Sequence, residues 1–263
     1  MTIKLAGIVL SGFALAVTVA PGQAASLVFA SFTPTGLAQD FLLTSTPVPD
    51  IANSFTVTIT GDASIDFIYK MGSTPFGNAT ESANLIFTAT SIVSGHCPTP
   101  TPNCLAENAP FTESGFSGSF SIKLVDPYIS PSGGSFSNLL SGTFGLLSPG
   151  QFTSTVGSSS AALEATGTSS NPNQVVFTSD FLAFANNINR DATFNFSQLT
   201  PLFSLITSNG TDNRFPNNFT AIGSGAFADV IAAEAPEPST FALLAGALLG
   251  LGLWQRKRRL LRR

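Results

Sequence analysis

The chain has 263 residues, of which 43% are hydrophobic and only 10% are charged, and its formal net charge is −4. Most of its basic residues lie near the two ends, with Lys4 close to the start and six Lys or Arg after position 255. Residues 26–235 therefore carry four basic against 14 acidic residues, a net charge of −10. This balance argues against binding to nucleic acid or anionic lipid, because both need a basic face.

Residues 1–24 have the pattern of a secretory signal peptide. Lys4 supplies the positive start, residues 5–20 are apolar, and small residues follow a Pro-Gly turn. We expect cleavage after Ala24, with Ala25 as the second candidate. A permanent membrane anchor is the alternative, but the apolar core is short for a span and a small-residue site follows it directly.

Residues 25–235 are predicted to form one all-β domain. Phe55, Val57 and Ile59 alternate with threonines, and the same period of two recurs at 116–124. Such alternation is typical of half-buried strands. Residues 138–144 also admit a short helical turn. The other candidate strands lie at 27–32, 65–69, 83–92, 151–156, 161–166, 174–184, 192–197, 202–206 and 219–227.

Many short strands separated by Gly, Pro, Asn and Ser indicate either two packed sheets or a sheet closed on itself. We expect a single antiparallel β-sandwich of the jelly-roll kind. The chain has 24 Phe against two Tyr and one Trp, so phenylalanine is predicted to fill the core. Each buried Phe is worth roughly 1.5–3 kcal/mol of stability.

Cys97 and Cys104 flank six residues of a Pro-rich segment. Since an exported chain meets an oxidising compartment, we predict a disulfide between them. A zinc site that includes His96 is the alternative, but zinc needs four ligands and the chain has a single His. We expect no metal site and no cofactor.

The residue types that catalysis needs are sparse. Any Ser-His-Asp triad would depend on His96, which lies beside a predicted disulfide, and no Gly-x-Ser-x-Gly elbow or phosphate-binding glycine loop occurs. Residues 187–191 have the oxygen spacing of a calcium loop without its Gly and closing Glu, so we interpret them as an Asn-rich turn. We expect that the protein is not an enzyme; a pair of carboxylates is the one catalytic route left open.

The last 28 residues begin with a motif whose two prolines lack backbone donors and fix φ, which keeps the segment extended. An apolar segment, 241–254, follows, and six basic residues lie within 256–263. Fourteen helical residues span about 21 Å, against a hydrocarbon core about 30 Å thick. This helix is short for a permanent anchor, although an ordinary tail anchor remains the alternative. The motif consists of Pro236, Glu237, Pro238, Ser239 and Thr240.

This order of motif, apolar helix and basic cluster resembles the PEP-CTERM protein-sorting signal of Gram-negative bacteria. The resemblance implies cleavage near the motif by an exosortase, a membrane-embedded cysteine peptidase, and an inner-membrane intermediate held transiently by the C-terminal helix. Delivery to the cell surface or extracellular matrix would follow. We therefore expect three parts: a signal peptide at 1–24, the β-domain at 25–235 and the sorting signal at 236–263.

For the β-domain we expect a structural or adhesive role in a biofilm or its exopolysaccharide. A carbohydrate-binding or carbohydrate-processing surface module is the alternative, and the fold class alone does not separate the two. A surface row of Trp or Tyr would favour the alternative, but residues 25–235 contain only Tyr69 and Tyr128.

Overall fold

Thirteen β-strands and no helix make up the part of the chain that the computed structural model describes. The described residues are 25–49, 54–70, 74–94, 106–145, 150–167, 175–184, 189–207 and 214–231. They belong to one compact unit, Ala25–Ile231. The strands are β1 (Ala25–Pro34), β2 (Phe41–Pro47), β3 (Ser54–Tyr69), β4 (Thr80–Ser94), β5 (Pro110–Ile129), β6 (Ser135–Phe144), β7 (Gly150–Thr155), β8 (Ser160–Thr166), β9 (Val175–Thr178), β10 (Asn189–Thr200), β11 (Leu205–Thr207), β12 (Arg214–Pro216) and β13 (Phe219–Ile231).

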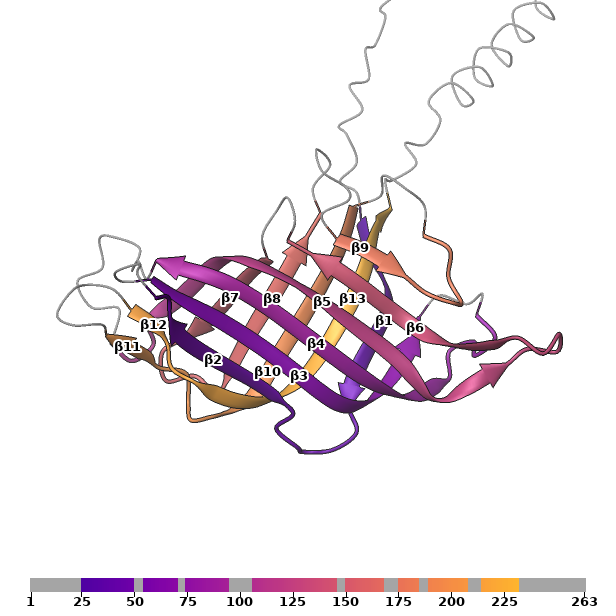
Figure 1. The fold of residues 1–263 in the computed structure, drawn as a ribbon, viewed down its shortest axis with the longest axis horizontal. Helices are drawn as coiled ribbons and strands as arrows, with labels where there is room; N and C mark the ends of the chain where they lie inside the picture. The colour runs from indigo at the N-terminus through magenta and orange to yellow at the C-terminus, as the bar shows by residue number, and fades with distance from the viewer. Residues whose placement is uncertain are drawn as a thin grey trace, which may run out of the picture. The chain divides into compact units, whose positions relative to one another are not determined.

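Eleven of these strands pair into one antiparallel sheet, and β11 and β12 form a separate ladder (Figure 1). The pairings form a circuit that runs β1–β3–β4–β5–β7–β8–β10–β13 and returns to β1. Strand β2 also pairs both β3 and β13, while β6 pairs β5 and carries β9. The predicted all-β antiparallel class is confirmed. The predicted sandwich is not, because hydrogen-bonded ladders connect all eleven strands instead of leaving two separate sheets.

The alternation in the sequence matches the two faces of the strands. Along β3 every second residue from Val57 to Tyr69 is buried, and the residues that alternate with them are more exposed. The long ladder between β3 and β4 keeps one register from Ser54 to Ile68, so apolar side chains of both strands point to the same side. The inner face of these two strands is therefore largely apolar.

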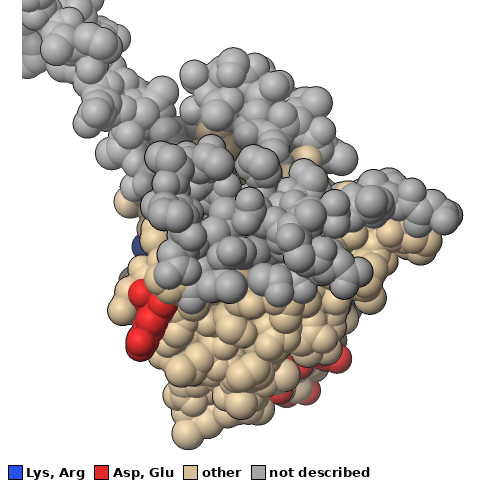
Figure 2. Space-filling model, turned by 90° about the vertical axis from the view of Figure 1, so that its left-hand side faces the viewer, with Lys and Arg blue, Asp and Glu red and all other residues tan. Residues whose placement is uncertain are grey.

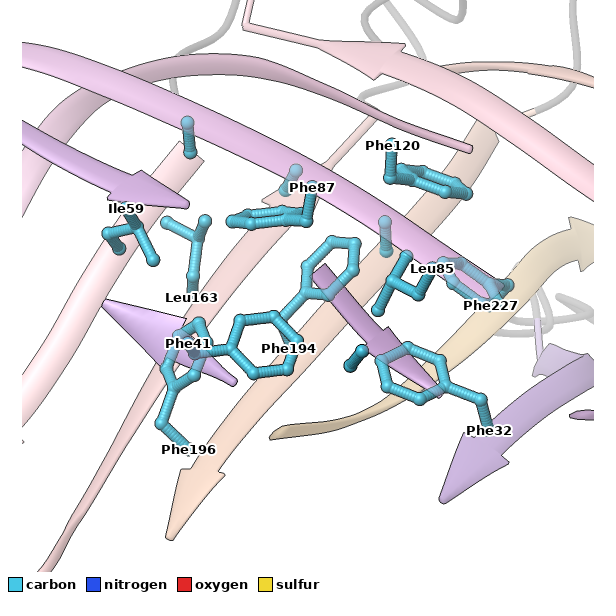
Figure 3. Close-up of a cluster of buried hydrophobic side chains, with 14 of the residues drawn as sticks. Phe32, Phe41, Ile59, Leu85, Phe87, Phe120, Leu163, Phe194, Phe196 and Phe227 are labelled. Atoms are coloured by element: carbon cyan, nitrogen blue, oxygen red, sulfur yellow. The ribbon is translucent and has the colours of Figure 1, made fainter. Parts of the chain in front are cut away.

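Phenylalanine fills the core, as predicted (Figure 3). The rings of Phe87 and Phe194 lie 4.5 Å apart between centroids, and those of Phe120 and Phe227 lie 4.8 Å apart. Aromatic pairs at such distances contribute about 0.5–1.5 kcal/mol beyond the area that they bury. The ring of Phe41 packs directly on the backbone at Gly223. A side chain does not fit there, because a Cβ added to Gly223 would lie 2.1 Å from the ring.

Residues 138–144 form part of β6, so the predicted helical turn is wrong. Ile122 of β5 pairs with Leu140, whereas Lys123 pairs with Asn138, so Leu139 is an extra, bulged residue. The bulge explains how two consecutive leucines, Leu139 and Leu140, can both be buried. Asp180 stabilises it, since its Oδ2 accepts hydrogen bonds from the backbone N–H groups of Ser137 (2.9 Å) and Asn138 (2.8 Å). The strand predicted at 174–184 is shorter than expected, because β9 ends at Thr178.

Candidate functional site

The two ends of the described unit lie side by side. Ala25, the first residue of β1, pairs with Ile231, the last residue of β13 (Figure 1). The predicted signal peptide immediately precedes β1, and Pro236 follows β13 after four intervening residues. The predicted signal peptide and the predicted sorting signal are therefore joined to the neighbouring ends of two paired strands. The pairing of β1 with β13 shows this, and the sequence alone does not.

A buried ion pair lies close to these strand ends. Arg190 of β10 is cross-strand partner to Asp229 of β13, with Nε 3.3 Å from Oδ1. The Arg190 side chain is only 5% exposed, and its guanidinium lies 5.4 Å from the centre of the Phe184 ring. Burial raises the pKa of Asp229, and the nearby Arg190 charge opposes that rise without cancelling it. The pair thus links the last strand to its neighbour at the apolar inner face.

The segment 187–191 was interpreted as an Asn-rich turn, but its second half is strand. Arg190 and Asp191 belong to β10 and, as consecutive strand residues, point to opposite faces. Burial raises the pKa of the Asp191 carboxyl, and the negative charge of Glu164 adds to that rise. Within the described ranges no three His, Cys, Asp or Glu residues gather in a way that could hold a metal ion.

An open groove of about 440 Å³ crosses β7, β8 and β10. Thr153, Ala162 and Asn195 lie in register across these three strands, on the face opposite the buried Phe152, Leu163 and Phe194. The sequence reasoning missed this groove, because Ser and Thr on a strand are equally consistent with an ordinary solvated face. Its lining residues are Thr153, Ser154, Thr155, Ser158, Ser160, Ala161, Ala162, Asn195, Phe196 and Ser197.

A partly buried carboxyl near the start of β5 was also missed. Glu113 lies opposite the buried Phe152 in the β5–β7 ladder, on the side of the sheet to which Phe111 points. Burial raises its pKa to about 7, although a hydrogen bond from the Ser114 backbone opposes the rise. The sequence does contain an indication of it, because Glu113 is an acidic residue at a position where the period of two places an apolar one. A pKa near neutrality suits an acid–base group, but glycoside hydrolysis would need a second carboxyl about 5–9.5 Å away.

Most of the predicted site residues lie outside the described part of the chain. These are Ala24, His96, Cys97, Cys104 and the motif Pro236, Glu237, Pro238, Ser239 and Thr240, together with the apolar segment 241–254. Ala25 is described, as the first residue of β1. Among the residues with described structure, no helix has the length and apolar character needed to cross a membrane.

A family model for the PEP-CTERM protein-sorting motif matches residues 234–259. The match covers all five motif residues, the apolar segment and most of the basic cluster, and it confirms the resemblance found in the sequence. No curated protein and no solved structure matches the chain.

Proposed function

We propose, from the premise that this chain is a PEP-CTERM protein and hence an exosortase-targeted extracellular protein, that its β-domain has a structural or adhesive role in the extracellular matrix. After release from the inner membrane by cleavage near Pro236–Pro238, the domain would contribute to the cohesion of a biofilm or its exopolysaccharide. The sorting motif at 234–259 carries this proposal, because it implies export to the cell surface.

The surface of the domain supports a role in contact with a hydrated polymer. Figure 2 shows one side of the molecule on which most described atoms belong to residues other than Lys, Arg, Asp and Glu. Along the outer face of β4, β5 and β6, the hydroxyl residues Thr88, Ser119 and Thr143 lie in register across the ladders. Hydroxyl groups both donate and accept hydrogen bonds, as the hydroxyls of a polysaccharide do.

The packing of the core supports the proposal that the domain is long-lived outside the cell. Among the described residues, at least twelve aromatic side chains are almost completely buried, and all of these except Tyr69 are phenylalanines. A sheet closed into a circuit around such a core leaves few strand edges for unwanted pairing. We therefore propose a durable matrix component without enzymatic turnover, in which Glu113 acts as a buried structural acid and not as a catalyst.

The groove over β7, β8 and β10 favours a second candidate function, a carbohydrate-binding surface module. In this alternative the domain recognises a particular glycan and does not only add bulk or cohesion to the matrix. The two functions are compatible, since a matrix adhesin can hold polysaccharide through such a site.

A deletion strain tests the matrix role. We expect the strain to form biofilm with reduced cohesion under shear, and we expect the full-length gene to restore it. A variant with Pro236, Glu237 and Pro238 changed to Ala serves as the matched control, because it keeps the β-domain and alters only delivery. Unchanged cohesion in the deletion strain would contradict the proposed function.

A further inference from the structure

We propose that the groove over β7, β8 and β10 is a binding site for a neutral, hydroxyl-rich polysaccharide chain. The inference rests on the proposed extracellular role and deepens it by naming the class of ligand. Six of the ten lining residues are Ser or Thr and a seventh is Asn195, while the other three, Ala161, Ala162 and Phe196, are apolar.

The polar groups of the groove match the hydrogen-bonding capacity of sugars. A Ser or Thr hydroxyl offers one donor and two acceptor positions, and an Asn side chain offers two of each. Sugar hydroxyls have the same mixed character, so each can pair with such a group in more than one orientation. The Asn195 side chain is exposed and lies on the outer face of β10, where it is available to a ligand.

Hydrogen bonds fix the turn that forms one end of the groove. Ser154 Oγ donates to the Ser160 carbonyl oxygen at 2.8 Å, and Ser160 N–H donates to Ser158 Oγ at 3.0 Å. The Gly157 N–H donates to the Phe203 carbonyl oxygen at 2.8 Å, which ties the same turn to the segment after β10. Groups that are already ordered lose less conformational entropy when a ligand binds.

The floor of the groove is low and apolar at its centre. Ala162 lies between Thr153 and Asn195 in the register of the three strands, and its methyl group is the smallest side chain in that row. A sugar ring can therefore place its C–H face over Ala162 while its hydroxyls reach the polar side chains on either hand. The volume of about 440 Å³ lies within the ordinary range of about 300–1,000 Å³ for small-ligand sites.

The charges around the groove select against an acidic polysaccharide. None of its lining residues is charged, so no cation is present to pair with a uronate or sulfate group. Glu164 follows Ala162 by two residues and is exposed on the same face of β8. Residues 26–235 are strongly acidic overall, which further disfavours the approach of a polyanion.

Affinity gel electrophoresis of the exported, processed protein tests the proposal. We expect dextran or laminarin, which are neutral, to retard the protein in the gel, and alginate, a polyanion, to leave its mobility unchanged. Retardation by alginate alone, or by none of the three, would overturn the inference.

Two variants with matched controls locate the site. Ala162→Glu places a bulky charge on the groove floor and should abolish retardation, whereas Ser64→Glu, at an exposed position of β3, should not. Asn195→Ala should weaken binding about two- to tenfold, the worth of one hydrogen bond. The control is Asn84→Ala on the outer face of β4. Equal retardation of Ala162→Glu and the wild-type protein would exclude this groove.

The two proposals fail in different ways. If the deletion strain keeps normal cohesion while the purified protein is retarded through the groove, the matrix role is wrong and the binding site stands. Suppose instead that the deletion strain loses cohesion, that the gene for the Ala162→Glu variant restores cohesion, and that the variant protein is not retarded in the gel. The matrix role then stands, and the domain does not contact the polymer through the groove.

Discussion

Asp229 faces Arg190 across the ladder between the last strand and β10, and the two charged groups meet on the inner, apolar side of the sheet. Neither residue is conspicuous in the sequence, where 39 positions separate them. The pair lies two residues before the end of β13, the strand that leads to the sorting motif. It links the end of the domain that carries the export signal to the apolar core.

Replacing Arg190 by Ala should lower the free energy of unfolding by about 3 kcal/mol, because the Asp229 carboxylate loses the positive charge that favours its ionised form. This value is near the lower end for breaking a buried pair, because the Asp229 side chain remains 26% exposed. Urea unfolding measures the change, with Lys123→Ala at an exposed position of β5 as the control. Equal midpoints for Arg190→Ala and wild-type protein would show that the pair contributes nothing.

Stability should fall as the pH rises from about 4.5 to about 7, because of Glu113. Its carboxyl binds a proton more tightly in the folded than in the unfolded chain, since the folded pKa is raised to about 7. The folded state therefore holds more protons in this window, and deprotonation favours unfolding. The loss should be about 1–2 kcal/mol once partial solvent screening is allowed for.

Glu113→Gln should remove that part of the pH dependence and stabilise the protein at pH 8. Unfolding curves at pH 4.5, 6 and 8 measure it, and Glu107→Gln, at an exposed position before β5, is the control. The carboxyls of Asp191 and Asp229 also have raised pKa values, so a residual slope of the same sign should remain in the variant. An unchanged slope in Glu113→Gln would refute the assignment.

Gly223→Ala should destabilise the core by about 1–3 kcal/mol, the usual cost of overpacking. The added methyl group would come within 2.1 Å of the Phe41 ring, which must then move against its neighbours Phe87 and Phe196. Thermal unfolding measures the loss. Gly36→Ala is the matched control, because nothing lies within 4 Å of its added Cβ.

Changing Pro236, Glu237 and Pro238 to Ala should leave an uncleaved precursor in the membrane fraction. The motif match spans these residues, and we expect the two prolines, which lack backbone donors and fix φ, to favour an extended segment that a peptidase can bind. Intact-mass measurement of the exported protein tests the expectation. A mature mass identical to that of wild-type protein would contradict processing at this motif.

Cys97 and Cys104 should resist thiol labelling until a reductant is added. Both residues lie outside the described part of the chain, so the disulfide remains a prediction from their spacing and the export route. Mass spectrometry after alkylation of native and reduced protein gives the answer. Because the closed loop is short, a Cys97→Ser/Cys104→Ser variant should lose only about 2–3 kcal/mol of stability.

Much of the fold class was predictable, because local alternation decides which residues face the core. The alternating patterns at Phe55, Val57 and Ile59 and at 65–69 predicted two strands that the structure joins into β3, and the abundance of Phe predicted the core. The bulge at Leu139 defeated the same reasoning, since one extra residue breaks the period of two. The candidate groove could not be foreseen, because its residues come from three strands and only the register brings them together.

By itself the sequence indicated export to the cell surface and determined the class of fold. A sorting motif acts as a short linear segment, so the order of Pro236–Thr240, the apolar run and the basic cluster is readable without a structure. Only the tertiary structure decided that the sheet closes into a circuit, that Ala25 pairs with Ile231 and that Arg190 meets Asp229. These contacts join residues far apart in the chain. They depend on strand order and register, which the packing of the whole core selects and no local pattern specifies.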